Sequence, residues 1–225
     1  YSKSGAGCVM AVTSNLPVHR VDAELDELLS PDAPAWDDAE ESAIALVPTP
    51  LEQQPSAYVQ AAWQDRARGE VSEVRVRAVA NPSAVTLRLE WGAERPQRRI
   101  DDVNVFSDAC AVLFPEDGQE ANLDTMGSPE QPVLGWFWRA GSDEPFSITA
   151  KGLGTVARTG EHPLRCRSRW ASGRWRVVLA QPFSPPIQPP GTVPIAFAVW
   201  SGAVQERAGL KSYSGRFHEL RFDHE

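Results

Sequence analysis

Several features that define whole classes of function are absent from this sequence. No apolar run approaches the length of about 18 residues that a membrane-spanning helix needs. There is no G-x-S-x-G motif, no phosphate-binding glycine loop and no cluster of metal ligands around the four histidines. A basic excess is also missing, because the formal net charge is −8. We therefore expect no hydrolytic triad, no membrane span and no nucleic-acid partner.

Cysteine is scarce, with only Cys8, Cys110 and Cys166 in the chain. These three are too far apart in the sequence for a zinc or iron–sulfur site, and the lack of C-x-x-C-H excludes covalently attached c-type haem. Cys110 and Cys166 could form a disulfide in an exported protein or remain as two buried thiols. The stretch "SGAGC" that ends at Cys8 is typical of the end of a bacterial lipoprotein signal, so a lipid anchor at Cys8 is one alternative.

What the sequence has in abundance is short alternating apolar segments among 19 prolines and 16 glycines. Their period of two residues indicates β-strands. We expect strands at 42–47, 72–80, 84–91, 108–115, 132–140, 146–152, 173–183, 192–202 and 217–222. The "NPS" between the second and third of these predicts a hairpin.

This pattern predicts a mainly β protein, an antiparallel β-sandwich with a few short helices. The runs 108–114 and 193–200 are apolar on both faces, so these strands should be central. A short helix is expected at 22–29, ended by Pro31, while 55–70 could be a helix or a loop. We expect an N-terminal tail at 1–18 and a single domain at 19–225.

An acidic run lies between residues 22 and 41, with nine carboxylates and no basic side chain. The ordinary interpretation of such a run is a solvated face. The alternative is a docking surface for a basic partner. Salt would then slow the approach of that partner by screening the charges.

Met126 stands out because it lies in a turn-rich stretch, "DTMGSPEQP", rather than in an apolar segment where methionine usually fills gaps. The following strand carries Trp136 and Trp138, which share strand parity. Lys211 occupies a second turn, "GLKSYSG", and a single loop lysine is ordinarily a solvated charge. The eight tryptophans also allow an aromatic-lined carbohydrate surface, although most of them fall in expected strands, where core packing is the default.

The ordered set of segments resembles the haem b-binding gamma subunit of periplasmic complex iron–sulfur molybdoenzymes, such as ethylbenzene dehydrogenase, dimethyl sulfide dehydrogenase, and selenate and chlorate reductases. Each matching stretch is short, and their order over about residues 31–222 is the specific part. The stretches are "PDAPAWDDAEESAIALVP", "EVRVRAVANPSAVTLRLEW", "FSDACAVLFP", "TMGSPEQPVLGWFWRA", "WRVVLAQPF" and "VPIAFAVWSGAVQERAGLKSYSGRFHELRF".

The resemblance implies one non-covalent haem b held by loops at one end of the sandwich. It implies Met126 and Lys211 as the two axial iron ligands, with Trp136 and Trp138 beside the macrocycle. His218 is the competitor of Lys211, because related sandwich cytochromes such as that of cellobiose dehydrogenase use methionine and histidine. The parity of His218 with Leu220 and Phe222 would point it inward.

The function implied is electron transfer, not catalysis by this chain alone. The subunit would relay electrons between an iron–sulfur beta subunit and a soluble cytochrome or similar carrier, beside a molybdopterin alpha subunit, in the periplasm or otherwise outside the cytoplasm. The substrate of the parent complex, the direction of electron flow and the haem potential are not encoded in any pattern of the sequence. The alternative function is a carbohydrate-binding or structural β-sandwich module without haem.

Overall fold

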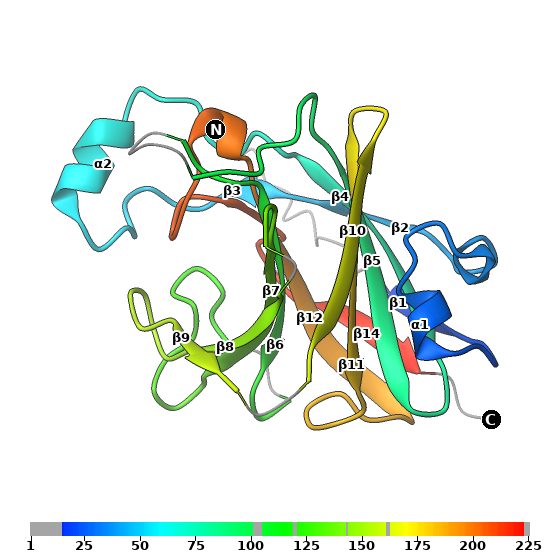
Figure 1. The fold of residues 1–225 in the computed structure, drawn as a ribbon. Helices are drawn as coiled ribbons and strands as arrows, with labels where there is room; N and C mark the ends of the chain where they lie inside the picture. The colour runs from blue at the N-terminus through cyan, green and yellow to red at the C-terminus, as the bar shows by residue number, and fades with distance from the viewer. Residues whose placement is uncertain (1–14, 101–104, 119–120, 143, 161–162, 223–225) are drawn as a thin grey trace, which may run out of the picture.

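A computed structural model of the chain describes residues 15–100, 105–118, 121–142, 144–160 and 163–222 (Figure 1). The strands of its first half are β1 (Asn15–Arg20), β2 (Ser42–Ala45), β3 (Val47–Pro48), β4 (Glu73–Ala80), β5 (Ala84–Gly92) and β6 (Ala109–Pro115). Those of its second half are β7 (Val133–Arg139), β8 (Phe146–Ala150), β9 (Ala157–Thr159), β10 (Arg165–Ala171), β11 (Arg174–Pro182), β12 (Gly191–Trp200), β13 (Ser212–Tyr213) and β14 (His218–Phe222). The helical elements are α1 (Leu25–Leu28), α2 (Ala57–Trp63) and the 3-10 turns η1 (Pro34–Trp36) and η2 (Gly202–Val204).

The strands form a mostly antiparallel sheet that curls into two facing layers, as the mainly β prediction required (Figure 1). Its order is β10-β11-β5-β4-β1-β14-β12-β6-β7-β8-β9, and β1 pairs in parallel with both β4 and β14. The predicted hairpin is confirmed as β4–β5, where the side chain of Asn81 accepts the backbone N–H groups of Ser83 and Ala84. The two runs expected to be central are β6 and β12, which pair with each other.

The strand expected at 42–47 is divided into β2 and the start of β3, and four strands were not expected from the sequence: β1, β9, β10 and β13. Residues 15–18 belong to β1 rather than to a tail, and Cys8 lies outside the described residues. The undecided stretch at 55–70 contains α2, whose N-cap Ser56 accepts the N–H of Val59. No helix among the described residues is long and apolar enough to cross a membrane.

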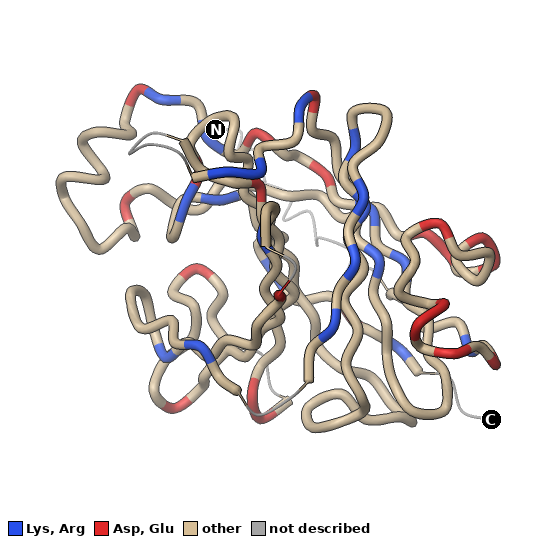
Figure 2. The backbone as a smooth tube through the Cα atoms, viewed as in Figure 1, with Lys and Arg blue, Asp and Glu red and all other residues tan. Residues whose placement is uncertain are grey.

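The acidic segment folds back on its own sheet rather than lying free. Asp26 pairs with Arg165 of β10, and Asp32 pairs with Arg169 and with Arg176, the latter at 2.9 Å. Figure 2 shows these acidic positions gathered on the α1 side, next to the arginines along β10 and the neighbouring strands. Part of the charge expected for a basic partner is therefore already neutralised within the chain.

The main core lies between the two layers and contains the largest buried side chains. Cys110 is buried in this core and Cys166 packs against it, and no disulfide joins these two side chains in the structure. Burial, and to a lesser degree the neighbouring Cys166, raises the pKa of the Cys110 thiol well above its ordinary value. A second apolar cluster lies on the outer face of β6, β7 and β12, and it forms the floor of the candidate site.

Candidate functional site

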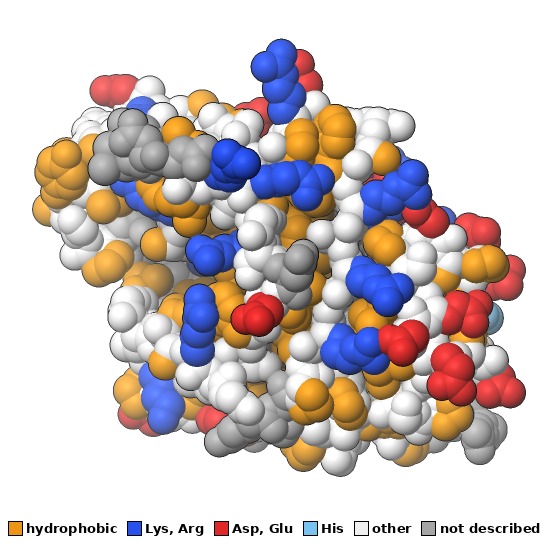
Figure 3. Space-filling model, in the orientation of Figure 1, with side chains coloured by type: hydrophobic (Ala, Val, Ile, Leu, Met, Phe, Trp, Pro, Cys, Tyr) orange, Lys and Arg blue, Asp and Glu red, His pale blue; other side chains and the backbone are white. Residues whose placement is uncertain are grey.

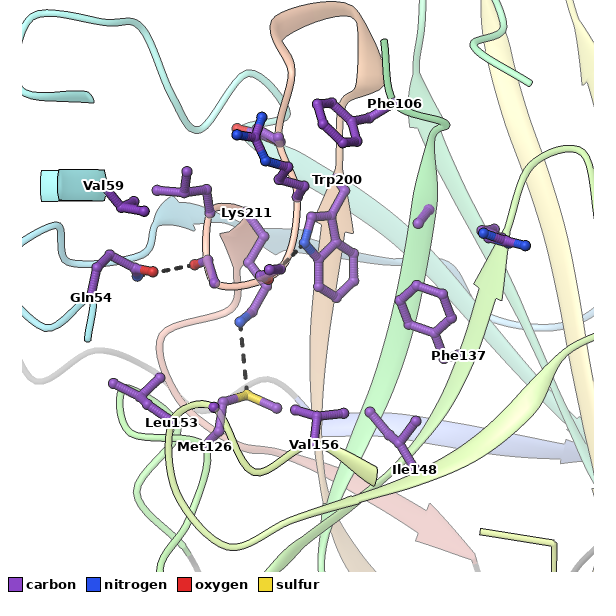
Figure 4. A pocket seen from close by; sticks show the side chains of 18 of the residues that line it. Gln54, Val59, Phe106, Met126, Phe137, Ile148, Leu153, Val156, Trp200 and Lys211 are labelled. Carbon is purple, nitrogen blue, oxygen red and sulfur yellow. Dashed lines mark hydrogen bonds between the residues drawn. The ribbon is translucent and has the colours of Figure 1, made fainter. Parts of the chain in front are cut away.

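A cavity of about 610 Å³ opens on the outer face of the β6–β7–β8 layer. Its floor is formed by these strands, and the residues before and within α2 and the loop 206–211 close its other sides. In Figure 3 it is the hollow between α2 and the β8–β9 edge, with hydrophobic and basic side chains around it. Met126 and Lys211 both line this cavity, as Figure 4 shows.

The outer face of β6 and β12, on the side where the cavity opens, carries smaller side chains than their inner face. The outer face of β6 and β12 presents Ala109, Ala111, Ala196 and Ala198, whereas their inner face presents cysteine, valine, isoleucine and phenylalanine. Gly135 of β7 belongs to the same floor, and a Cβ there would lie 2.9 Å from the side chain of Leu113. Alternation along the strands thus fills the sandwich core while leaving room outside it.

The loop before β7 presents Met126 through a network of local hydrogen bonds. The side chain of Asn122 accepts the N–H of Thr125 at 3.3 Å, and its backbone carbonyl accepts the N–H of Gly127 at 2.7 Å. The N–H of Met126 donates to Leu123 at 3.1 Å. Asparagine commonly stabilises turns in this way. The loop is therefore a defined structure that holds the thioether at one place.

The backbone of Met126 is strained, with φ at +57°. A non-glycine residue in this left-handed region costs free energy and persists where the surroundings demand it. The next residue, Gly127, also has a positive φ, and a Cβ there would lie 2.6 Å from the carbonyl oxygen of Gln131. Strain at a side chain that faces a cavity indicates a role for that side chain.

The Lys211 turn is fixed by contacts with the segment before α2. Thr49 donates its N–H to the carbonyl of Lys211 at 3.0 Å and its hydroxyl to that of Gly209 at 2.7 Å. Gln54 donates its amide to the same Gly209 carbonyl at 3.2 Å (Figure 4). A Cβ on Gly209 would lie 2.2 Å from the Gln54 amide oxygen, so a larger residue there would displace the Gln54 side chain.

A buried carboxylate anchors the other end of the same loop. Glu206 is 1% exposed and accepts backbone N–H groups from Gly69 at 2.7 Å and from Ser201 at 2.9 Å. Burial raises the pKa of this carboxyl, and the backbone donors oppose that change. The loop from 201 to 211 is therefore held at both ends before it delivers Lys211.

Lys211 is the unusual charge of the site, because its side chain is buried without an anionic partner. It is 4% exposed, and no carboxylate in the described part of the chain lies within ion-pair distance of its Nζ. Its contacts are the Sδ of Met126 at 3.8 Å and the ring of Trp200, whose centroid is 5.6 Å away. Burial lowers the pKa of Lys211 to about 8.

The aromatic wall of the cavity is not the one expected from the sequence. Trp136 and Trp138 are buried in the core between the layers, where Trp138 packs against Trp175 with ring centroids 5.1 Å apart. The wall is formed instead by Phe137, which contacts Trp200 at 5.4 Å and Phe146 at 4.9 Å between ring centroids. Parity correctly paired the two tryptophans but does not say which face of β7 meets the cavity.

His218 lies in the core rather than at the cavity, although it is turned inward as its parity suggested. It is 3% exposed, and its ring centroid is 6.5 Å from that of Phe197. Neither ring nitrogen has a hydrogen-bond partner among the described residues. Burial, assisted by Arg216, lowers the pKa of His218 to about 4. Of the two expected nitrogen ligands, the structure brings only Lys211 to Met126.

Three arginines that sequence reasoning did not single out line the cavity: Arg139, Arg158 and Arg207. The guanidinium of Arg158 lies 3.8 Å from the ring centroid of Phe146, and that of Arg207 lies 4.4 Å from that of Phe106. Two exposed apolar side chains, Ile100 and Val156, also line it. No group of three or more His, Cys, Asp or Glu side chains suited to a metal ion occurs among the described residues.

Known proteins similar to this chain include redox subunits. The alignment with chlorate reductase subunit gamma of Ideonella dechloratans has 34% identity and covers 67% of this chain and 65% of that protein. The alignment with the putative respiratory nitrate reductase heme subunit ORF7 of Haloferax mediterranei has 28% identity and covers 95% of this chain and 76% of that protein. Dimethylsulfide dehydrogenase subunit gamma of Rhodovulum sulfidophilum is 29% identical, and the alignment covers 57% of this chain and 52% of that protein. The chain thus spans between half and three quarters of the length of these relatives.

Among solved structures, the fold is similar to that of a family 9 carbohydrate binding module from Caldicellulosiruptor kristjanssonii. Its glucose complex superimposes with a TM-score of 0.53 at 8% identity, covering 94% of this chain and 97% of that one. Its cellotriose complex gives a TM-score of 0.54 at 10% identity. Such low identity supports the shared β-sandwich fold alone. The family model for ethylbenzene dehydrogenase matches residues 33–163, more than half of the sequence and including the Met126 loop, so this chain belongs to the ethylbenzene dehydrogenase family.

Proposed function

We propose that this chain binds one non-covalent haem b between Met126 and Lys211 and transfers single electrons as a gamma subunit of an exported molybdenum oxidoreductase complex. The observation that carries this proposal is the meeting of a thioether and an amine, 3.8 Å apart, inside an apolar cavity. Family membership and the haem and gamma subunits among the relatives support it.

The two donor atoms fit a metal placed between them. Met126 Sδ and Lys211 Nζ lie 3.8 Å apart, so a metal held by these two side chains would have one soft sulfur donor and one nitrogen donor. Both side chains are neutral when they coordinate, and a soft thioether favours the reduced ion and raises its reduction potential.

Burial prepares Lys211 for this role. An amine coordinates only after losing its proton, and desolvation already lowers the pKa of Lys211 to about 8. If Met126 and Lys211 both held the iron, no coordination position would remain for oxygen or a substrate. Haem supplies a one-electron couple here, and the residues around it suit electron transfer rather than catalysis by this chain.

The remaining lining residues suit the rest of a haem molecule. Phe137 and Trp200 offer flat apolar surface beside the ligands, and the cavity of about 610 Å³ has space for a large planar group. Haem also carries two carboxylates, for which arginine is the best side-chain partner. We assign that role to Arg139, Arg158 and Arg207. Ile100 and Val156 mark the exposed edge, where an iron–sulfur beta subunit or a soluble cytochrome would exchange electrons.

The carbohydrate-binding alternative has less support. Sugar platforms need exposed aromatic rings, yet seven of the eight tryptophans are buried, and Trp170 packs partly buried against the core. The cavity also contains a cation without a partner rather than a set of paired polar groups. In a structural module without haem, the cost of desolvating the buried Lys211 would have no functional explanation.

Reconstitution with haem tests the proposal. The purified chain should take up one haem per molecule, give the spectrum of a six-coordinate low-spin iron, and release the haem into acidified organic solvent because no cysteine attaches it. Uptake in less than stoichiometric amounts, or a high-spin spectrum for the unmodified chain, would contradict the proposal. Soluble cello-oligosaccharides should leave the spectrum and the thermal stability unchanged.

A further inference from the structure

A hydrogen bond near the cavity joins the two segments of the chain that carry Met126 and Lys211. The hydroxyl of Tyr213 donates to the carboxylate of Asp124. Asp124 lies two residues before Met126, and Tyr213 lies two residues after Lys211. Within the described residues, this bond and the contact between Lys211 and Met126 are the side-chain hydrogen bonds that link these loops. The Tyr213–Asp124 bond therefore links the segment that carries Met126 to the segment that carries Lys211.

The two ends of this bond differ in how firmly the rest of the fold holds them. Tyr213 is in β13, where it pairs with Ala198 of β12 and with Val47 of β3. Asp124 is in the long connection between β6 and β7, which is built mainly on hydrogen bonds within itself. The carbonyl of Met126 makes one backbone contact outside that connection, with the N–H of Gly152 at 3.2 Å. The sheet therefore fixes Tyr213, and Tyr213 in turn holds Asp124 and the connection that contains it.

The surroundings favour a strong bond. Tyr213 is 5% exposed and belongs to the same apolar cluster as Met126. A hydrogen bond to a charged acceptor in such a place is stronger than a neutral one.

We propose that the Tyr213–Asp124 hydrogen bond is a latch that sets the separation of Met126 and Lys211. Tyr213 and Asp124 are then positioning residues for the site. The statement about haem rests on the function proposed above, while the latch itself is a property of the chain alone. Without the hydroxyl, the strained Met126 loop relaxes, and the thioether moves away from the amine. The side chains of Tyr213 and Asp124 need not touch the haem for this effect.

The haem-free chain gives the first test, because it contains only two methionines, Met10 and Met126. Methionine labelled with 13C at its methyl group should give two signals, and Tyr213→Phe should shift or broaden the Met126 signal while leaving that of Met10 unchanged. Asp124→Ala should produce the same change, and Asp124→Asn, which keeps an acceptor oxygen, should stay near the unmodified spectrum. Tyr58→Phe, at a tyrosine that is 82% exposed, is the matched control.

The haem-loaded chain gives the second test. Tyr213→Phe and Asp124→Ala should each lose haem about tenfold faster and show a mixture of low-spin and high-spin iron. The double variant should be no worse than either single one, because both remove the same bond. Asp124→Asn should restore most of the low-spin signal, which a general loss of packing would not allow.

The outcomes separate the latch from the function. If the unmodified chain binds no haem, the proposed function fails, and the methyl spectra of the haem-free chain still decide whether the latch exists. If it binds haem with six-coordinate iron but Tyr213→Phe and Asp124→Ala match it in both tests, the latch is overturned. Should Tyr213→Phe fail to fold, Asp124→Ala compared with Asp124→Asn decides alone.

Discussion

The same strands of this protein build two apolar regions with opposite properties. The inner faces of β6, β7 and β12 contribute large side chains to a filled core, where Trp138, Trp175 and Phe197 lie. Their outer faces contribute mainly small side chains to a second cluster with a cavity of about 610 Å³ above it. Close packing supplies stability in the first region, whereas the second gives up packing and makes room for a ligand.

Each region also contains one buried nitrogen base, and the two illustrate the same difference. Lys211 faces the cavity and a thioether, while His218 is enclosed by the core without a hydrogen-bond partner. Desolvation lowers the pKa of both. A buried base therefore becomes a candidate ligand only where there is space for a metal group next to it.

The largest expected effect is the loss of haem ligation from the cavity side. Lys211→Leu or Met126→Ala should convert the low-spin iron to a high-spin or water-bound form, and Met126→Ala should also lower the reduction potential. His218→Leu should leave the six-coordinate spectrum intact, because His218 lies in the core. Absorption and electron paramagnetic resonance spectra check this. A high-spin iron in His218→Leu together with a low-spin iron in Lys211→Leu would assign the nitrogen ligand to His218.

The core side should respond in stability rather than in ligation. Trp138→Ala should lower the free energy of unfolding by about 3–5 kcal/mol, the usual cost of removing a buried tryptophan. Chemical denaturation of the haem-free chain measures this, with Trp170→Ala as the comparison at a partly buried tryptophan. Once folded and loaded, Trp138→Ala should keep a low-spin spectrum. A lost iron ligand in that variant would mean that the two regions are not separable.

Lys211→Leu should also stabilise the haem-free chain, by up to about 3 kcal/mol at neutral pH. The pKa of Lys211 is lowered to about 8 from 10.5, so the unfolded chain binds more protons than the folded one between these values. Stability of the unmodified chain should therefore rise as the pH rises from about 8 to 10.5, and this rise should be absent in Lys211→Leu. Urea denaturation across that range is the measurement. Equal pH profiles would show that Lys211 is not desolvated.

His218 should produce a dependence of the same sign at acid pH. Its pKa is lowered to about 4 from 6.5, so stability that is fully present above 6.5 is lost as the pH falls towards 4. His218→Leu should flatten the stability curve between pH 6.5 and 4 by as much as about 2–3 kcal/mol. His19→Leu, at a strand residue outside the core clusters, is the control and should retain the wild-type slope.

Much of the fold could be predicted because its strands alternate clearly. Val74, Val76 and Leu87 follow a period of two, and "NPS" is a turn signal, so the β4–β5 hairpin follows from local chemistry. β10 was missed because "RCRSRWA" alternates arginines with cysteine, serine and tryptophan and contains no run of aliphatic side chains. Its Cys166 and Trp170 are only partly buried against the core, so the strand has a weak apolar pattern.

The sequence by itself determined that Met126 stands in a turn, that Trp136 and Trp138 share one face, and that Lys211 lies two residues after a glycine in a second turn. One further signal was present in it, because Lys211 is one of only three lysines beside 19 arginines. Only the tertiary structure decided which face of β7 meets the cavity, since that strand is apolar on both faces and its alternation has no polar reference. It also brought residues 126 and 211 to 3.8 Å. Contacts between segments so far apart depend on the curvature and order of the whole sheet, which no local pattern specifies.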